Sequence, residues 1–318
     1  MATSKQTTVS KSTPVKKPRQ LKKPKRGKRV RKHLKVVRRP VPNAWTVLRQ
    51  SLTHIFRHPK LFFGITLVYL VLTIVLVKGF GVTNNVAQLK TALQLTFHGK
   101  SGAVSTGLLI FGQLLTSAGN ATSSVAGAYQ TILLVTVSLA LIWALRQTHS
   151  DHPPKIGIRD AFYKGLYPLV PLLLVLIVIG IQLIPLIIAG SLYNLVFGNH
   201  LAVHWYEQYA WAFGLGLLAL WSIYMVSSSV FGLYIVTLPD VRPFQALRSA
   251  RDLVRYRRWL VVRKVVFLPI AMVILIGLII VPLIFVWPAV VVWVFLLLSM
   301  LSLAVIHSYM YSLYRALL

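Results

Sequence analysis

Long uninterrupted runs of apolar residues dominate the chain from residue 61 onward, and short polar or basic stretches separate them. A helix needs about 20 consecutive apolar residues to cross a hydrocarbon core of about 30 Å. Six runs meet this requirement, so the sequence predicts an all-α polytopic membrane helix bundle within residues 61–318. The predicted spans are 61–80, 126–145, 166–190, 209–237, 265–286 and 289–311.

The last two runs are separated only by Trp287 and Pro288. A proline in so short a connection marks a turn. We therefore expect the fifth and sixth spans to form a tight antiparallel hairpin.

Basic residues alternate along the chain with stretches that carry few or none. Nineteen Lys and Arg precede the first span, two lie in loop 81–125, four in 146–165, none in 191–208 and eight in 238–264. The positive-inside rule then places both termini in the cytoplasm. No apolar stretch of signal-peptide type follows the basic N-terminus within 30 residues, so we expect no cleaved signal peptide.

The segment 103–119 is apolar but short. Interfacial, re-entrant and spanning placements all remain open for it. Because a crossing here would break the alternation of charge, we expect loop 81–125 to hold two short amphipathic helices on the outer face.

Residues 1–42 form a polybasic tail. Between Lys16 and Arg39, 14 of 24 residues are Lys or Arg and none is acidic. With so little apolar surface to bury, the tail is predicted to be disordered. Its expected partners are anionic lipid head groups and, through non-specific contact, RNA or the ribosome. Sequence-specific nucleic-acid binding is not expected, because no recognition fold or aromatic stacking residue accompanies the tract.

Basic residues next to the spans are expected to contact the membrane surface together with the tail. These residues are Lys22, Lys23, Lys25, Arg26, Arg49, Arg248, Arg255 and Arg258. His54 and His58, four residues apart before Pro59, are also expected to contact head groups.

A weak internal repeat precedes three of the spans. Segments 43–61 and 242–260 align without gaps, and 158–169 is a shorter third copy. Apolar residues in these segments recur at helical spacing, which predicts amphipathic interfacial helices, the first at 43–60 with Asn43 as its N-cap. Duplication and convergence both explain the similarity. The residues aligned at one shared position are Ser51, Gly165 and Ala250.

The stretch "QALRSARDLVRYRRWLVV", residues 245–262, with the span after it, is similar to amphipathic linkers in a group of uncharacterised bacterial inner-membrane proteins. That group includes the YciC-like family and the membrane domain attached to some glycerophosphodiester phosphodiesterases. The resemblance covers about the last two-thirds of the chain and implies a helical bundle of about six spans in a bacterial plasma membrane. The phosphodiesterase catalytic domain is absent, so its activity is not implied.

Acidic residues are scarce, with five in the whole chain and none inside a predicted span. Proton- or cation-coupled carriers use intramembrane carboxylates, and hydrolytic or phosphoryl-transfer sites need acids for metals or protons. The chain also has no Cys, which excludes disulfides and thiolate chemistry. We therefore expect no enzyme activity and no cofactor.

A few polar residues inside the spans have two interpretations. Gln182 lies between Pro171 and Pro185, where it either lines a cavity or makes an interhelical hydrogen bond, and the bond is favoured. Ser228 and Gly232 have the spacing of close helix packing, with a polar substrate path as the alternative. His307 is expected to bond to a neighbouring helix.

His200, His204 and Glu207 lie at i, i+4 and i+7. On one helix they would share a face, as an outer metal site requires, but the order differs from the metalloprotease motif. A solvated interfacial His pair is the favoured interpretation.

Together these features favour a non-enzymatic membrane scaffold or membrane-homeostasis protein. The alternative is a permease-like subunit for an uncharged or amphiphilic solute, and a membrane-bound lipid enzyme comes third. A polar cavity ringed by Gln182 and Ser227–Ser229 would favour the permease, whereas a solid apolar core would favour the scaffold.

Overall fold

The computed structural model describes residues 42–78, 124–150, 156–198, 204–239 and 241–318. Within these ranges every regular element is a helix, and six helices are long and apolar enough to cross a membrane. The all-α architecture with six membrane helices is therefore confirmed. The tail up to residue 41 and the segment 103–119 lie outside the described residues.

After the first span, the membrane helices are longer than the apolar runs that predicted them. They are α2 (Pro59–Thr73, continued by the π-helical turn η1, Ile74–Lys78), α5 (Ser124–Thr148), α7 (Leu169–Gly198), α8 (Trp205–Ile235), α10 (Arg258–Val286) and α11 (Pro288–Leu317). Helix α10, for example, begins at Arg258 rather than at residue 265. Arg and Lys are good helix formers whose long side chains can reach the interface, so a helix continues through them.

Three short helices lie outside the spans: α1 (Ala44–Arg57), α6 (Ile158–Gly165) and α9 (Pro243–Val254). All three are strongly amphipathic, as the repeat predicts. Asn43 occupies the N-cap position of α1, but its side chain makes no capping hydrogen bond, and only its carbonyl accepts the Val47 N–H at 3.0 Å.

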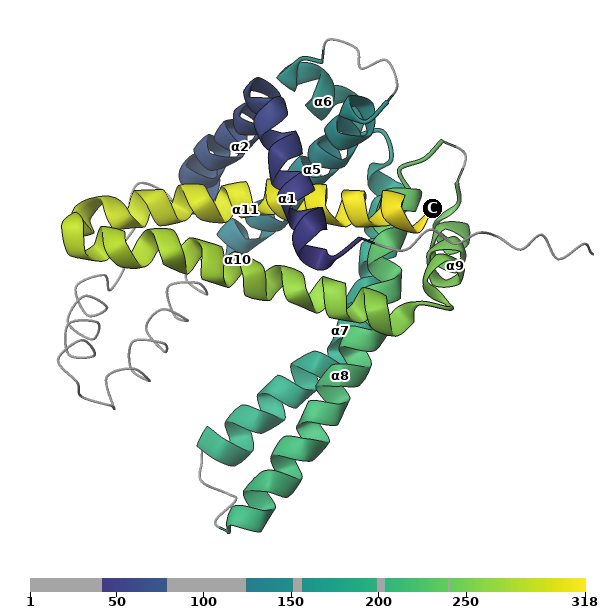
Figure 1. Cartoon of the computed structure of the whole chain (residues 1–318), viewed down its shortest axis with the longest axis vertical. Coiled ribbons are helices and arrows are strands. Elements are labelled where there is room, and N and C mark those ends of the chain that lie inside the picture. The colour runs from purple at the N-terminus through teal and green to yellow at the C-terminus, as the bar shows by residue number, and fades with distance from the viewer. Residues whose placement is uncertain (1–41, 79–123, 151–155, 199–203, 240) are drawn as a thin grey trace, which may run out of the picture. The chain divides into compact units, whose positions relative to one another are not determined.

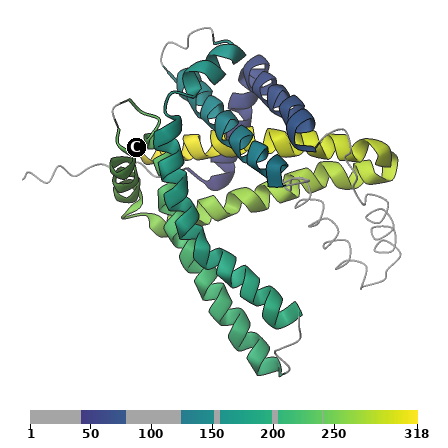
Figure 2. The ribbon, with the colours of Figure 1, turned by 180° about the vertical axis from the view of Figure 1, so that it is seen from behind.

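Each short helix packs mainly on one membrane helix and then leads into another. Helix α6 packs on α5 and leads to α7, and α9 packs on α8 and leads to α10. Helix α1, which leads to α2, packs on α11 from the far end of the chain (Figures 1 and 2). The described fold therefore consists of three units of membrane helix, short amphipathic helix and membrane helix.

Small residues allow the short helices to approach their membrane helices closely. A Cβ added to Gly165 would lie 3.0 Å from the Cα of Ala140 and 3.1 Å from the carbonyl oxygen of Leu139. Ser51 and Ala250, which align with Gly165, are both fully buried. The aligned position is therefore occupied by a small, buried residue in all three units. The paired buried residues one turn earlier are Val47, Ala161 and Ala246.

Helices α10 and α11 form the expected hairpin, with Trp287 alone between them (Figure 1). They carry a small apolar cluster around Ile280, Ile284 and Val291, separate from the main core. The main core includes residues of all six membrane helices, α10 and α11 among them, and holds large buried side chains such as Phe62 and Tyr309.

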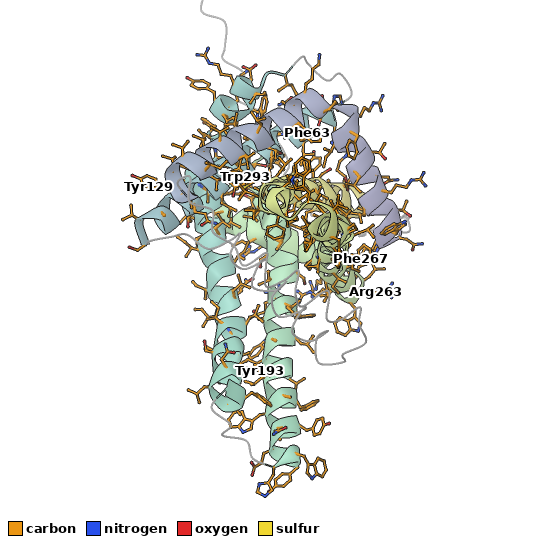
Figure 3. All side chains as sticks on the ribbon, turned by 90° about the vertical axis from the view of Figure 1, so that its left-hand side faces the viewer. Phe63, Tyr129, Tyr193, Arg263, Phe267 and Trp293 are labelled. Atoms are coloured by element: carbon orange, nitrogen blue, oxygen red, sulfur yellow. The ribbon has the colours of Figure 1, made fainter. Side chains whose placement is uncertain are left out.

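Helices α7 and α8 run side by side with little of their surface covered (Figure 3). Only 22% and 17% of the most apolar windows of α7 and α8 are buried, against 44% for α5. Side chains such as Tyr193 project from this pair. In a bilayer these uncovered apolar faces contact lipid tails.

Candidate functional site

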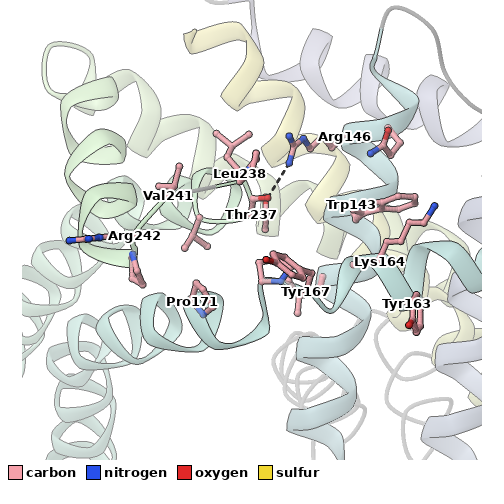
Figure 4. A pocket seen from close by; sticks show the side chains of 17 residues that line it. Trp143, Arg146, Tyr163, Lys164, Tyr167, Pro171, Thr237, Leu238, Val241 and Arg242 are labelled. Carbon is pink, nitrogen blue, oxygen red and sulfur yellow. Dashed lines mark hydrogen bonds between the residues drawn. The ribbon is translucent and has the colours of Figure 1, made fainter. Parts of the chain in front are cut away.

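A cavity of about 890 Å³ lies where α5, α6 and the start of α7 meet the end of α8 and the start of α9 (Figure 4). Three basic side chains border it, from Arg146, Lys164 and Arg242, and most other lining residues are apolar. None of the described residues that line it is Asp, Glu or His. It therefore offers positive charge and apolar walls.

Arg146 is the most enclosed of the three cations. It lies in the last turn of α5, is half-buried, and donates from Nη1 to the main-chain oxygen of Thr237 at 3.1 Å. This bond satisfies a carbonyl just beyond the end of α8 and fixes the guanidinium above the cavity (Figure 4). A guanidinium has five N–H donors, so this bond uses only part of its capacity.

Lys164 ends α6 on the other side of the cavity. Its Nζ lies 6.0 Å from the ring centroid of Trp143 and 3.9 Å from the Asp160 carboxylate. Both members of the ion pair are at least half exposed, and such pairs contribute little to stability. The pair therefore leaves the ammonium available to a ligand.

Arg242 occupies the N-cap position of α9, next to Pro243, and its side chain is exposed. The N-terminus of α7 lies at the same cavity, where Pro168 and Pro171 form part of the wall. Helix N-termini carry partial positive charge from unpaired N–H groups. Two helix ends thus add to the field of the three side chains.

Two tyrosines stand at the cavity in open positions. Tyr163 is 82% exposed and Tyr167 is 93% exposed. Tyr and Trp collect at the level of lipid head groups, where an apolar ring and a polar tip are both accommodated. Exposure of this kind fits a cavity that opens at the membrane interface.

A second polar cluster joins α1 to the end of α5. His54 Nε2 lies 2.9 Å from the Thr148 hydroxyl, and the His54 and His149 ring centroids are 3.8 Å apart. Burial, followed by repulsion from His149, His58, Arg57 and Arg315, lowers the pKa of His54 to about 4. Burial also lowers the pKa of His149, whose Nδ1–H donates to the Leu145 carbonyl at 2.9 Å. His54 is therefore half-buried against the end of α5.

The polar residues singled out on α7 and α8 are used in helix packing. The Ser222 hydroxyl donates to the main-chain oxygen of Gln182 at 2.6 Å, so the interhelical bond exists but uses the backbone. Among the described residues, the buried Gln182 Oε1 has no hydrogen-bond partner. A Cβ on Gly232 would meet Leu247 of α9 at 3.1 Å, as expected for close packing.

The serines that would ring a cavity under the permease alternative bond to their own helix. Ser228 donates to the Met225 carbonyl at 2.9 Å and is 9% exposed. Ser227 and Ser229 likewise donate to carbonyls of α8. Their hydroxyls are thus already occupied by the helix that carries them.

His307 bonds to a neighbouring helix, as expected. Its Nδ1 lies 3.0 Å from the hydroxyl of Tyr234, and both side chains are buried. This contact joins α11 to α8.

The basic residues expected at the membrane surface fall into two groups in the structure. Arg49, Arg248 and Arg255 are exposed. Arg258 is half-buried, donates from Nη1 to the Tyr224 hydroxyl at 3.0 Å, and lies 5.3 Å from that ring. It therefore links α10 to α8. The tail residues Lys22, Lys23, Lys25 and Arg26 lie outside the described residues.

The histidine–glutamate candidate is only partly described. His204 is the N-cap of α8, and its backbone N–H donates to Glu207 Oε2 at 3.3 Å, so this pair starts a helix. His200 lies outside the described residues. In the part of the chain that the structure covers, no group of three or more His, Asp or Glu is arranged to hold a metal ion.

Sequence reasoning missed the cavity cations and Lys264. Lys264 lies in α10, is 4% exposed, and donates to the Pro42 carbonyl. The sequence did contain a signal for the cavity cations, because each lies within one turn of a helix end on the basic side of the charge pattern. These cations are Arg146, Lys164 and Arg242. The sequence did not indicate that these three ends meet.

Comparison of the chain with protein-family models, curated proteins and solved structures gives no match.

Proposed function

We propose that this multi-pass membrane protein is a non-enzymatic scaffold or membrane-homeostasis protein of a bacterial plasma membrane, with both termini in the cytoplasm. The observation that carries the proposal is the threefold use of one unit, in which an amphipathic helix is fixed against a membrane helix through a small buried residue. Such helices hold an apolar face and basic side chains at a constant depth in one leaflet.

The packing of α7 and α8 supports a scaffold over a solute path. Ser227, Ser228 and Ser229 donate to carbonyls of their own helix, and Gly232 is closed over by Leu247. A hydroxyl already bonded in this way is less available to a moving solute. The scarcity of carboxylates supports the non-enzymatic part of the proposal.

The positive charge of the interfacial segments supports the partners that we propose. Exposed Arg49, Arg248 and Arg255 lie on α1, on α9 and just after α9. Each basic residue near an anionic leaflet contributes about 1 kcal/mol to association. We propose anionic lipid head groups as their partners, with the tail adding non-specific contact to lipid, RNA or the ribosome. From the resemblance of residues 245–262, we also propose that the chain is related to the YciC-like group.

The permease remains the second candidate because of one atom. The Gln182 amide oxygen is buried without a partner among the described residues, and a polar group left this way marks sites where a ligand or water binds. Pro185 in the same helix removes one main-chain hydrogen bond close by.

A flux experiment separates the two candidates. Proteoliposomes are mixed with hyperosmotic glycerol or urea, and their re-swelling is followed by light scattering. We expect the proteoliposomes to re-swell at the same rate as protein-free vesicles. Faster re-swelling that Gln182→Leu abolishes would establish the permease and remove the scaffold proposal.

In-cell crosslinking tests the scaffold directly. The protein is purified with its crosslinked partners, and the partners are identified by mass spectrometry. The same is done with Gly165→Leu, in which the larger side chain pushes α6 off α5. A scaffold retains a reproducible set of membrane proteins that the variant loses. If both forms retain the same background, the scaffold proposal fails.

A further inference from the structure

The cavity between α5, α6, α7, α8 and α9 combines three cations with apolar walls, and nothing in the scaffold proposal requires that combination. Its volume, about 890 Å³, is within the range of small-molecule sites. The cations are spread along it: Arg242 at one end, Lys164 at the other and Arg146 between them (Figure 4). From this arrangement we infer that the cavity is a binding site for one anionic phospholipid, whose phosphate and other head-group and glycerol oxygens are shared among Arg146, Lys164 and Arg242.

The cations are suited to a phosphate because they arrive from separate elements with donors to spare. Arg146 is oriented by its bond to Thr237, and Lys164 is steadied by Trp143. Arginine offers planar, paired donors that match phosphate oxygens, and lysine adds a mobile point charge. The N-termini of α7 and α9 add N–H groups and positive potential at the same place.

The walls identify the ligand as a lipid rather than a free phosphate. Leu139, Val236, Leu238 and Val241 are apolar and line the same cavity as the cations. Free inorganic phosphate has no apolar part that such walls could bury, whereas a phospholipid has its glycerol and upper acyl carbons. The exposed Tyr163 and Tyr167 place the opening at the head-group level, where a lipid enters laterally.

The inference does not depend on the scaffold proposal. A permease with this fold would have the same cavity, because the lining residues lie at helix ends and not around Gln182. The flux experiment and the lipid experiment can therefore fail separately.

The test is native mass spectrometry of the full chain titrated with phosphatidylglycerol, with phosphatidylcholine of the same acyl chains as the neutral comparator. We expect a first phosphatidylglycerol to bind at least tenfold more tightly than phosphatidylcholine. The triple variant R146Q/K164Q/R242Q should lose about fivefold in affinity per cation, or about a hundredfold in all. The matched triple variant K60Q/R251Q/R263Q removes equal charge from exposed positions outside the cavity and should change affinity less than threefold.

Two further arms keep the outcome decisive. The double variant K164Q/R242Q leaves the Arg146–Thr237 bond in place, so a loss of about 25-fold in a protein with unchanged thermal midpoint supports the site. Sodium phosphate at millimolar concentration should not displace the lipid, and displacement would make free phosphate the ligand. Equal loss in the cavity and control triple variants, or equal affinity for the two lipids, would overturn the inference.

Discussion

Ser308 of α11 donates its hydroxyl proton to the main-chain oxygen of Ser51 in α1 across 3.2 Å, although 257 positions separate the two residues. Both side chains are fully buried. Ser51 aligns with Gly165, which meets Ala140 in the unit of α5, α6 and α7. The bond therefore closes the unit of α11, α1 and α2, whose helices come from the two ends of the described chain.

Close packing at the aligned position predicts a graded response to added methyl groups. Gly165→Ala places its Cβ against backbone atoms of α5 that cannot move aside, and it should destabilise the protein by about 1–3 kcal/mol. Gly232→Ala meets the flexible end of Leu247 and should cost less. Gly180→Ala, with no atom within 4 Å, should be neutral or stabilising by up to about 1 kcal/mol. Tryptophan fluorescence during unfolding in mixed micelles measures all three, and equal effects would contradict the packing.

Acid should weaken the fold through His54. Because the pKa of His54 is lowered from 6.5 to about 4, the unfolded chain binds a proton in this interval that the folded chain does not. Stability is therefore complete above pH 6.5 and falls as the pH drops toward 4. His54→Gln should make the thermal midpoint depend less on pH over this range, whereas substitution of the exposed His204 by Gln should not. An unchanged slope in His54→Gln would place the acid sensitivity elsewhere.

The buried contact between α8 and α11 should show energetic coupling. Tyr234→Phe removes the hydroxyl 3.0 Å from His307 Nδ1, and hydrogen bonds between membrane helices contribute about 0.6–2 kcal/mol. A double-mutant cycle with His307→Leu should return a coupling of that size. Tyr209→Phe, at a residue that is 72% exposed, serves as the control and should have no effect. A coupling near zero would mean that the bond contributes nothing.

The proposed orientation is testable without background, because the chain has no Cys. Ser101→Cys and Asn199→Cys should react with an impermeant thiol reagent in intact cells. Ser150→Cys and Ser249→Cys should react only after the membrane is opened. Labelling of Ser249→Cys from outside would reverse the orientation.

The basic tail should act as an electrostatic attachment. Deleting residues 1–40 should leave the six helices inserted, since none of them includes these residues. A peptide of residues 16–39 should bind anionic vesicles and RNA alike, and affinity for RNA should fall by about a thousandfold or more between roughly 50 and 200 mM salt. Binding to one partner that salt does not weaken would reveal specific recognition.

The six membrane helices could be predicted because each is encoded locally, as a single apolar run such as 166–190 that a bilayer requires. The interfacial helices were readable for the same reason, from helical spacing around Leu48 and Leu247. Their ends were less predictable, since basic residues such as Arg258 extend a helix into the interface. Helix existence is thus a local property, and helix length depends on the interface.

The cavity could not be predicted in this way. Arg146, Lys164 and Arg242 each look like an ordinary basic residue at a helix end, where it offsets exposed carbonyls or contacts water. Their convergence depends on how α5, α6 and α9 pack, and that packing is set by small residues such as Gly165. His54 illustrates the same limit, because its partners Thr148 and His149 lie at the end of α5 and just after it, far along the chain.

The docking of α1 on α11 has a consequence for biosynthesis. The ribosome makes Ser51 first and Ser308 257 residues later, and at about 5–20 residues per second the wait lasts roughly 13–50 seconds. During that time α1 lacks α11, the helix on which it mainly packs, whereas α6 and α9 meet α5 and α8 as soon as they are made. Until α11 is made, α1 must therefore shelter its apolar face in the membrane surface or on a chaperone. Premature termination before α11 would leave this face permanently without that partner and open to quality-control proteases.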